Sequence, residues 1–337
     1  MKTMRAAVIE GPHKITLQEV PYPTPGPGQV VVKVEACGIC GTDYHILEGD
    51  FLSPYPLIPG HEFSGTVYEL GEGVENWQVG ERVAVDPSVY CGECYYCLSN
   101  QGNMCQKWNA VGVTLNGAFA EYVAVPAKNL YRLPENMNFQ QGAFVEPLSC
   151  VVYAMRRLNI RFGDKVLLFG AGPMGLLLLQ AVVKGGASEA VVVDLAEDKL
   201  AKARQLGAHK TFLGTAGLQE AYPLGFDIVI DATGVPAVIE NMFRFAGNRA
   251  KIMQFGCAPK DAKVSVSPFD IYNKDWEILG TMALLFTFHP AVNLLKNGVV
   301  VADPLTTREI SLDEFPAYLS QPKDSKDLKV LVCPWKK

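Results

Sequence analysis

The chain has 337 residues, of which 49% are hydrophobic and 19% are charged, and its net charge is −5. This length has room for two domains with separate cores, and the composition is that of a globular enzyme. An acidic balance without a lysine- or arginine-rich run argues against a nucleic-acid partner.

The N-terminal segment, the apolar runs and the cysteines indicate the cellular compartment. The opening MKTMRAAVIE lacks the long apolar segment of a signal peptide, and no apolar run reaches membrane-spanning length. Nine cysteines are present, and several are clustered, which indicates metal binding in a reducing compartment rather than disulfides. We therefore expect a cytoplasmic protein without a membrane partner.

The first part of the chain predicts short strands. Residues 5–10 and 15–20 are expected to pair around Gly11-Pro12, PYPTPGP is a rigid connector, and residues 30–36 form a further strand. This β-rich opening predicts a small barrel-like domain.

Two motifs that follow carry metal-ligand side chains. Residues 37–49 read CGICGTDYHILEG, and residues 59–63 read PGHEF. Thiolate, imidazole and carboxylate are zinc ligands, and a mixed set that leaves one position open is typical of catalytic zinc. Cys40 or His61 alone would fit an ordinary core position, but together the motifs favour a metal site.

Residues 91–105, CGECYYCLSNQGNMC, space four cysteines as C-x2-C-x2-C-x7-C. Four thiolates close a tetrahedral site, which predicts a structural zinc. An iron–sulfur cluster is the chemical alternative, because ferredoxin sequences share part of this spacing. The cysteines are Cys91, Cys94, Cys97 and Cys105.

The stretch from Lys165 to Asp194 predicts a strand, a glycine turn, a helix and a second strand. Gly170 permits the tight turn, Gly172 lets the backbone approach a pyrophosphate, and Gly175 allows close packing of helix on strand. Asp194 stands where a carboxylate accepts hydrogen bonds from a ribose. These features predict a dinucleotide site.

In the rest of the chain, predicted helices and strands alternate. Helices are expected at 147–158, 199–206, 235–245 and 287–295, and strands at 210–213, 226–231, 250–255, 276–280 and 328–332. Such alternation predicts an α/β fold with a doubly wound parallel Rossmann sheet, whose ligands bind beyond the carboxyl ends of the strands.

GICGTDYH followed by GHEFSG resembles the zinc-dependent medium-chain alcohol and polyol dehydrogenase family, and the glycine fingerprint falls where that family has it. The resemblance covers nearly the whole chain. It implies a β-rich GroES-like zinc catalytic domain at 1–147 and 283–337, and a Rossmann dinucleotide-binding domain at 148–282.

The resemblance also implies a ligand set. Cys40 and His61 are the first ligands, with Glu62 a close or direct third, and Cys37 is not a ligand. In VEPL, Glu146 stands where sorbitol dehydrogenases have a glutamate that acts at the zinc directly or through water, and where classical alcohol dehydrogenases have a cysteine. The four-cysteine loop matches the structural-zinc lobe of the family.

The resemblance further implies roles for residues around the metal. Thr42 and His45 would relay the alcohol proton to solvent. Candidate substrate contacts are Tyr44, Ile46, Phe51 and Phe119. Many polyol dehydrogenases have an aromatic residue at the place of Ile46, and this departure leaves the substrate open.

Cofactor choice depends mainly on Asp194, whose charge repels a 2′-phosphate and therefore favours NAD over NADP. Lys199, nearby, softens that preference. By resemblance, further cofactor contacts come from Pro173, Met174, Thr233, Gly234, Val235, Ala283, Leu284 and Arg308.

We therefore expect a zinc enzyme that oxidises a secondary alcohol of a polyol or cyclitol to a ketone with NAD. L-threonine or a simple secondary alcohol is an alternative substrate on the same machinery. The alternative outside the enzymes is a non-catalytic sensor that binds zinc and nucleotide. The family is commonly a homodimer or homotetramer.

Overall fold

The computed structural model describes residues 2–336 and divides the chain into two units. One unit comprises the chain up to Ser149 and from Leu285 onward, and the other comprises Cys150–Leu284. Each predicted boundary lies two residues from the observed one. Helix α4, Val145–Leu158, begins in the first unit and ends in the second.

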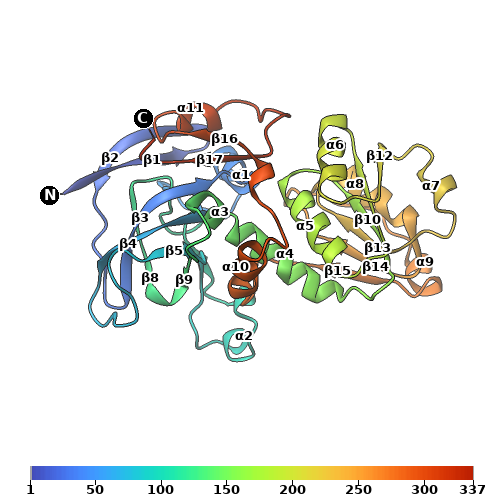
Figure 1. Ribbon diagram of the computed structural model, residues 1–337, viewed down its shortest axis with the longest axis horizontal. Helices are drawn as coiled ribbons and strands as arrows, with labels where there is room; N and C mark the ends of the chain where they lie inside the picture. The colour runs from blue at the N-terminus through green and yellow to red at the C-terminus, as the bar shows by residue number, and fades with distance from the viewer. Residues whose placement is uncertain (1, 337) are drawn as a thin grey trace. The chain divides into compact units, whose positions relative to one another are not determined.

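The first unit is built on a seven-stranded sheet (Figure 1). Its order is β16-β17-β3-β4-β5-β9, with β8 also paired to β3. A separate hairpin, β1 with β2, and a short β6–β7 pair complete the strands. The bounds are β1 Thr3–Gly11, β2 Lys14–Pro21, β3 Gln29–Gly38, β4 Glu62–Leu70, β5 Arg82–Val85, β6 Ser88–Val89, β7 Asn109–Ala110, β8 Tyr122–Pro126, β9 Leu130–Arg132, β16 Thr306–Ile310 and β17 Lys329–Val332.

Helices in this unit are short, and the sequence analysis expected only the one near residue 290. They are α1 Gly41–Glu48, α2 Tyr95–Leu98, α3 Phe139–Ala143, α10 Phe288–Lys296 and α11 Phe315–Leu319, with 3-10 turns at Gly102–Met104, Ala127–Asn129 and Asp303–Leu305. The buried core of this unit includes alternating valines of β3 and side chains of β4, β5 and β8.

The second unit is a six-stranded sheet of order β12-β11-β10-β13-β14-β15, in which every pairing is parallel. The chain leaves β10 toward β11 on one side and returns to β13 on the other. This reversal is the ligand-binding edge of such sheets. The strands are β10 Lys165–Phe169, β11 Glu189–Asp194, β12 Lys210–Leu213, β13 Phe226–Asp231, β14 Ala246–Gln254 and β15 Glu277–Gly280.

Helices accompany this sheet in the alternation that the sequence predicts (Figure 1). One expectation was too simple: residues 235–245 form α8 and then a 3-10 turn rather than one helix. The helices are α5 Pro173–Lys184, α6 Glu197–Gln205, α7 Leu218–Ala221, α8 Pro236–Met242 and α9 Pro268–Asn273, and the turn is Phe243–Phe245. No helix within residues 2–336 combines the length and apolar character needed to cross a membrane.

Asp86 follows β5 and is 7% exposed, and its carboxylate accepts a hydrogen bond from the Ser88 N–H at 2.8 Å. Desolvation outweighs that bond and raises the pKa of Asp86 from 3.8 to about 6. The folded chain therefore binds more protons here than the unfolded chain does, and this carboxyl's contribution to stability is lost as pH rises from about 4 to about 6.

Replacing Asp86 with asparagine removes the buried charge but keeps an acceptor oxygen. We expect the free energy of unfolding to rise by about 1–3 kcal/mol at about pH 8 and to change little at about pH 4. Thermal denaturation of both proteins at the two pH values measures this. An equal shift at both would show that Asp86 acts through packing rather than charge.

Candidate active site

Helix α1 carries the first metal motif. Cys40 is its N-cap residue, with extended backbone angles, and the N–H of Cys40 donates to Asp43 Oδ2 at 2.8 Å. Such a reciprocal contact between N-cap and third residue fixes the start of a helix. Thr42 and His45, three residues apart, therefore lie on one face of α1.

The second motif enters from β4. Gly60 has φ of +99°, and a Cβ there would lie 2.9 Å from Cys37 Sγ, so only glycine fits this turn. Antiparallel pairing of β3 with β4 sets Glu62 opposite Gly38. The end of β3 leads directly into Cys40, so this register brings the two motifs together.

The result is a compact buried cluster. Ligand atoms of Cys40, His61 and Glu62 lie within 4.8 Å of one another. His61 is 7% exposed and Glu62 1%. Two separate motifs predict these three ligands, and the structure brings them together.

Glu146, on α4 and 8% exposed, lies outside this three-residue group. Burial raises its pKa to about 8, with His61, Glu62 and Cys40 all close enough to interact electrostatically. Burial likewise raises the pKa of Cys40 to about 12. Because a cation among these groups stabilises their ionised forms, the donor set fits a divalent metal.

Orphaned polar atoms in the cluster support the same fit. Glu62 Oε1 and His61 Nδ1 are buried without a hydrogen-bond partner. Asp43, fully buried, places Oδ1 at 3.9 Å from His61 Nδ1. A carboxylate behind a histidine is the usual support of a metal-ligating imidazole. Asp43 was not predicted from the sequence, although an acid three residues after Cys40 was a visible signal.

The other residues near α1 differ in their placement. Thr42 Oγ1 lies 3.7 Å from Cys40 Sγ, and His45 is half-buried with Nδ1 3.9 Å from a Glu48 carboxylate oxygen. Tyr44 and Phe51 are half-buried against the core. These positions leave both relay residues and two of the four predicted substrate contacts available.

Two of the predicted substrate contacts lie in the hydrophobic core. Phe119 and Ile46 are both 0% exposed and belong to the hydrophobic core. The Phe119 ring packs on Phe315 with centroids 3.9 Å apart. Side chains that are enclosed in this way do not line an open cleft, so the aromatic and aliphatic patterns at these positions reflect core packing.

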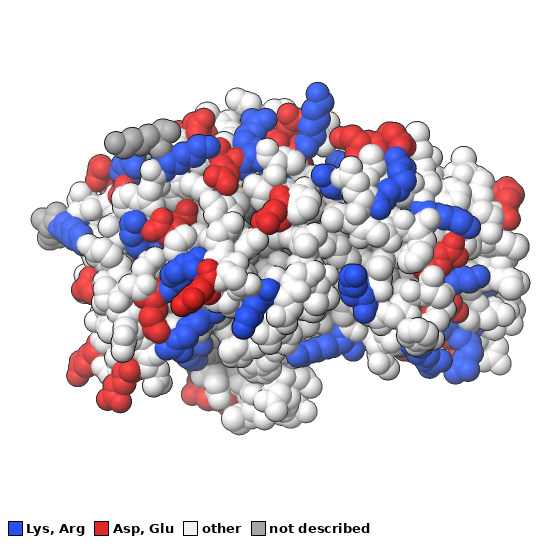
Figure 2. Space-filling model, in the orientation of Figure 1, with Lys and Arg blue, Asp and Glu red and all other residues white. Residues whose placement is uncertain are grey.

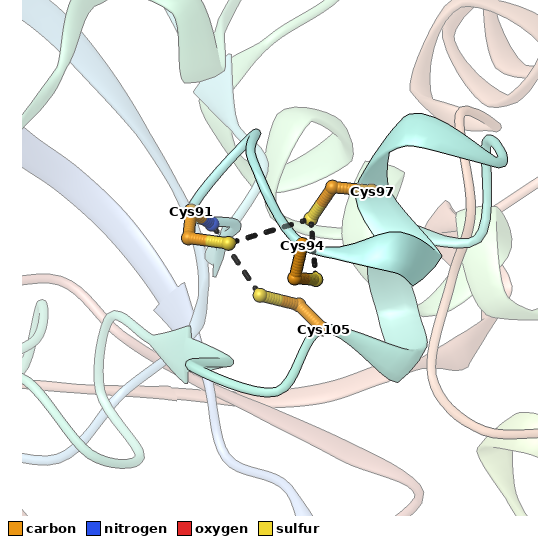
Figure 3. Close-up of side chains that lie close together, drawn as sticks. All are labelled: Cys91, Cys94, Cys97 and Cys105. Carbon is orange, nitrogen blue, oxygen red and sulfur yellow. Dashed lines mark hydrogen bonds between the residues drawn. The ribbon is translucent and has the colours of Figure 1, made fainter.

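The four cysteines come from the segment that follows β6 and precedes β7 in the chain, and their side chains converge (Figure 3). Their ligand atoms lie within 4.8 Å of one another, with Sγ–Sγ distances of 3.9 Å for Cys91–Cys97 and 3.5 Å for Cys94–Cys97. A zinc tetrahedron with Zn–S bonds of about 2.3 Å has sulfur–sulfur edges of about 3.8 Å. The spacing therefore fits one zinc ion rather than a larger iron–sulfur cluster.

Backbone N–H groups surround these thiols. The N–H groups of Cys91 and Lys107 donate to Cys105 Sγ at 3.4 and 3.3 Å. Bonds from the N–H groups of Cys97 and Gln106 lower the pKa of Cys94 to about 6. Such amide donors stabilise thiolates, which are the form that binds zinc.

The glycine turn in the second unit has the predicted shape. Gly170 has φ of +99°, and a Cβ on Gly175 would lie 2.0 Å from the Gly170 carbonyl oxygen. Gly172 is the N-cap of α5, faces open space, and is followed by Pro173 in the first turn. The start of α5 therefore offers free N–H groups to an anion, as a phosphate site requires.

Asp194 ends β11 beside that turn. Its Oδ2 accepts from the Ala171 N–H at 2.7 Å, and Oδ1 accepts from the N–H groups of Leu195 and Ala196 at 2.7 and 3.0 Å. The carboxylate thus ties the glycine turn to the next strand. Lys199, half-buried, follows in the first turn of α6.

The loop at the end of β13 is organised by an acid that the sequence analysis did not single out. Asp231 is fully buried, and its carboxylate accepts from the N–H groups of Thr233 and Gly234, from the Thr233 hydroxyl and from Gln254 Nε2. Its place at the end of the run FDIVID was a signal. Val235 follows as the N-cap of α8.

Three further predicted cofactor contacts lie later in the chain. Ala283 has φ of +49°, and Leu284 is 0% exposed. Arg308 lies on β16 of the first unit, where its guanidinium is 3.5 Å from Asp327 Oδ2. These three residues stay predictions.

Comparison with known proteins agrees with both halves of the chain. Residues 26–135 match the alcohol dehydrogenase GroES-like domain, and residues 173–297 match the zinc-binding dehydrogenase domain. D-arabinitol dehydrogenase 1 from Uromyces fabae is 34% identical over 98% of this chain and 97% of its own length.

Solved structures have the same fold. A protein from Sinorhizobium meliloti 1021, described as a zinc-binding dehydrogenase and bound to NADP, has a TM-score of 0.96 and 36% identity, covering 99% of this chain and 100% of its own. The alcohol dehydrogenase rspB from E. coli CFT073, complexed with NADH, has a TM-score of 0.92 and 30% identity over 99% and 100%. The chain therefore belongs to the zinc-dependent medium-chain alcohol and polyol dehydrogenase family.

Proposed function

We propose that this oxidoreductase transfers a hydride from a secondary alcohol of a polyol or cyclitol to NAD and releases a ketone. The observation that carries the proposal is the buried cluster of Cys40, His61 and Glu62, with the carboxylate of Glu146 close enough to interact with it electrostatically. A glutamate at the last of these positions is the feature that favours the polyol branch.

In this proposal Cys40, His61, Glu62 and Glu146 hold a catalytic zinc, and the four-cysteine lobe holds a structural one. Zinc, when bound, supplies a Lewis acid that favours loss of the alcohol proton. The Thr42 hydroxyl accepts that proton and passes it to His45 on the same face of α1, because imidazole is the side chain best suited to exchange protons near neutral pH. Tyr44 and Phe51 contact the substrate.

We propose NAD as the cofactor, on the basis of Asp194. The carboxylate next to the glycine turn opposes a 2′-phosphate by charge repulsion. The two related structures carry different cofactors, NADP in the S. meliloti protein and NADH in rspB, so the residues of this chain are the better guide. The fingerprint glycines, Pro173, Met174 and the Thr233–Val235 loop complete the proposed site.

Replacing Asp194 with asparagine tests the cofactor assignment. The amide keeps one acceptor oxygen for the backbone N–H groups but removes the negative charge. Because one like-charge contact is worth a few kcal/mol at such a site, we expect the ratio of kcat/KM for NADP to that for NAD to rise by about tenfold or more. Steady-state rates with each cofactor measure this. An unchanged ratio would show that Asp194 does not set the preference.

The proposed partners are a small polyol or alcohol and further copies of the same chain, in a homodimer or homotetramer. On the face shown in Figure 2, lysine and arginine side chains are interspersed with acidic ones, which gives no support to a nucleic-acid partner. None of the nine cysteines is paired in a disulfide, which is compatible with the proposed cytoplasmic location. Light scattering of the purified protein tests the oligomeric state.

A substrate panel tests the reaction. NADH absorbance is followed with sorbitol, xylitol, arabinitol, inositols, L-threonine and 2-butanol, with and without a zinc chelator. Turnover on a polyol that the chelator abolishes supports the proposal. Turnover on threonine or butanol alone would move the substrate class to the alternative. Bound zinc and NAD without turnover on any of them would favour the non-catalytic sensor.

A further inference from the structure

A buried ion pair joins the last strand to the candidate metal cluster. Lys329 Nζ on β17 lies 2.6 Å from Glu62 Oε2, and the two side chains are 3% and 1% exposed. It is the most buried pair of a lysine or arginine with an acid in the part of the chain that the structure describes. Charges are seldom placed this deep without a specific partner or task.

The lysine is fixed by more than one bond. Its Nζ also donates to the Ile39 carbonyl oxygen at 3.1 Å. Strand β17 pairs with the end of β3, where Val332 lies opposite Cys37 and Leu331 opposite Gly38, and β3 pairs on its other side with β4. The ammonium is therefore anchored to the backbone just before Cys40.

Space for the glutamate is reserved by a glycine. A Cβ on Gly38 would lie 2.3 Å from Glu62 Oε2, so any larger residue there would displace the carboxylate from the lysine. The other oxygen, Oε1, is buried and has no hydrogen-bond partner. One oxygen of Glu62 is thus held and the other is left to the cluster with Cys40 and His61.

We infer that Lys329 is a positioning residue of the catalytic metal site: it holds Glu62 by Oε2 and so presents Oε1 to the metal as a direct ligand. The inference rests on the proposed catalytic zinc. Lys329 lies outside both ligand motifs. With Glu62 held in this way, its carboxylate contacts the metal directly rather than through a water molecule.

Charge balance supports this role. With metal bound, the thiolate of Cys40 and the carboxylates of Asp43, Glu62 and Glu146 carry four negative charges against the two of a zinc ion. The ammonium of Lys329 offsets one of the two excess negative charges, and its contact with Glu62 keeps its own pKa raised despite burial. A site with a smaller excess of acid accommodates a new negative charge on substrate better.

The competing explanation is that the pair only ties β17 to β4. Zinc release to a chromophoric chelator separates the two, because the four-cysteine zinc in the same molecule is an internal reference. The proteins compared are the wild type, Lys329→Met, Glu62→Gln and the double variant. Glutamine is close in shape to glutamate but is a much weaker ligand, and the double variant leaves no unpaired buried charge, so it is the one expected to fold most readily.

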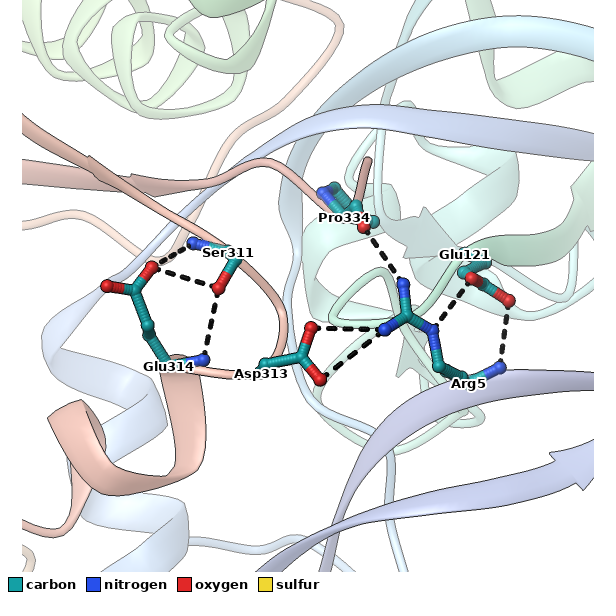
Figure 4. A network of polar contacts seen from close by, with 6 residues as sticks. All are labelled: Arg5, Glu121, Ser311, Asp313, Glu314 and Pro334. Atoms are coloured by element: carbon teal, nitrogen blue, oxygen red, sulfur yellow. Dashed lines mark hydrogen bonds and ion pairs between the residues drawn. The ribbon is translucent and has the colours of Figure 1, made fainter. Parts of the chain in front are cut away.

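Arg5→Met is the matched control. Arg5 also ties distant segments, with its guanidinium 3.0 Å from both Glu121 Oε1 and Asp313 Oδ2 and further bonded to the Pro334 carbonyl (Figure 4). None of these partners is a candidate ligand. This variant is expected to release both zinc ions at wild-type rates, even where its melting temperature falls.

We expect Lys329→Met to release the open-site zinc about 10- to 100-fold faster than the wild type, the range typical of outer-shell metal partners. The four-cysteine zinc should leave at an unchanged rate. If Lys329 acts through Glu62, adding Lys329→Met to Glu62→Gln should cause no further change, because the two substitutions remove the same interaction.

Two results would overturn the inference. One is wild-type release of the open-site zinc from Lys329→Met, with only a lower melting temperature of the metal-free protein. The other is that the double variant releases the open-site zinc faster than Glu62→Gln alone, so that the effects of the two substitutions add. A wild type that binds zinc at the four cysteines alone would instead contradict the proposed function itself.

Discussion

Replacing Cys40 with serine is expected to abolish turnover while leaving NADH binding intact. Cys40 is the thiolate of the open cluster, and losing the zinc removes several kcal/mol of transition-state stabilisation, which corresponds to a fall of about a thousandfold or more in kcat/KM. The glycine fingerprint and Asp194 lie in the other unit and do not depend on this side chain. NADH production, zinc content and NADH fluorescence titration measure the three quantities.

Cys37 provides the matched control, since it lies three residues earlier and is fully buried in the core. A Cys37→Ala variant should keep both zinc ions and measurable turnover, with some loss of stability from the missing sulfur. Turnover by Cys40→Ser, or loss of the open-site zinc from Cys37→Ala, would show that Cys40 is not the thiolate ligand of the catalytic site.

Replacing Cys94 with serine should remove the structural zinc and unfold the lobe that contains it. This lobe buries little apolar surface of its own, with Tyr95 and Leu98 both 73% exposed, so the metal is its main source of order. Structural zinc sites in small domains contribute about 10–16 kcal/mol of apparent binding energy, and most of that is lost with one ligand. We expect one zinc equivalent to disappear, proteolysis to begin within residues 91–105, and the melting temperature to fall.

Cys257→Ser is the control for this experiment, because Cys257 is an exposed thiol outside both metal clusters. It should retain full zinc content and wild-type resistance to protease. Full zinc content and unchanged protease resistance in Cys94→Ser would instead remove the structural role from the lobe.

The sequence predicted what depends on neighbours along the chain. The glycine turn, the four-cysteine loop and the strands of the parallel sheet follow from spacing and from apolar runs, and the structure has them within a few residues. Comparison with known proteins confirmed the family, and with it the fold that these motifs implied. Local patterns suffice where backbone turns and strand burial decide the structure.

The parts that were missed depend on register between distant strands. Lys329 and Glu62 are 267 residues apart, and a lysine between apolar residues of a strand usually points to solvent. Asp43 gains its role only because the pairing of β3 with β4 brings His61 to it. The burial of Phe119 and Ile46 could not be predicted either. A hydrophobic side chain near a site looks alike in sequence whether it lines a cleft or fills the core.

The most direct test of the central claim uses a polyol carrying deuterium on the oxidised carbon, chosen from the panel by turnover. The zinc-loaded enzyme should transfer that deuterium to NAD and produce deuterated NADH, seen by mass spectrometry. The chelated enzyme should produce none until zinc is restored. Unlabelled NADH, or labelled NADH formed equally well after chelation, would contradict zinc-dependent hydride transfer from a secondary alcohol.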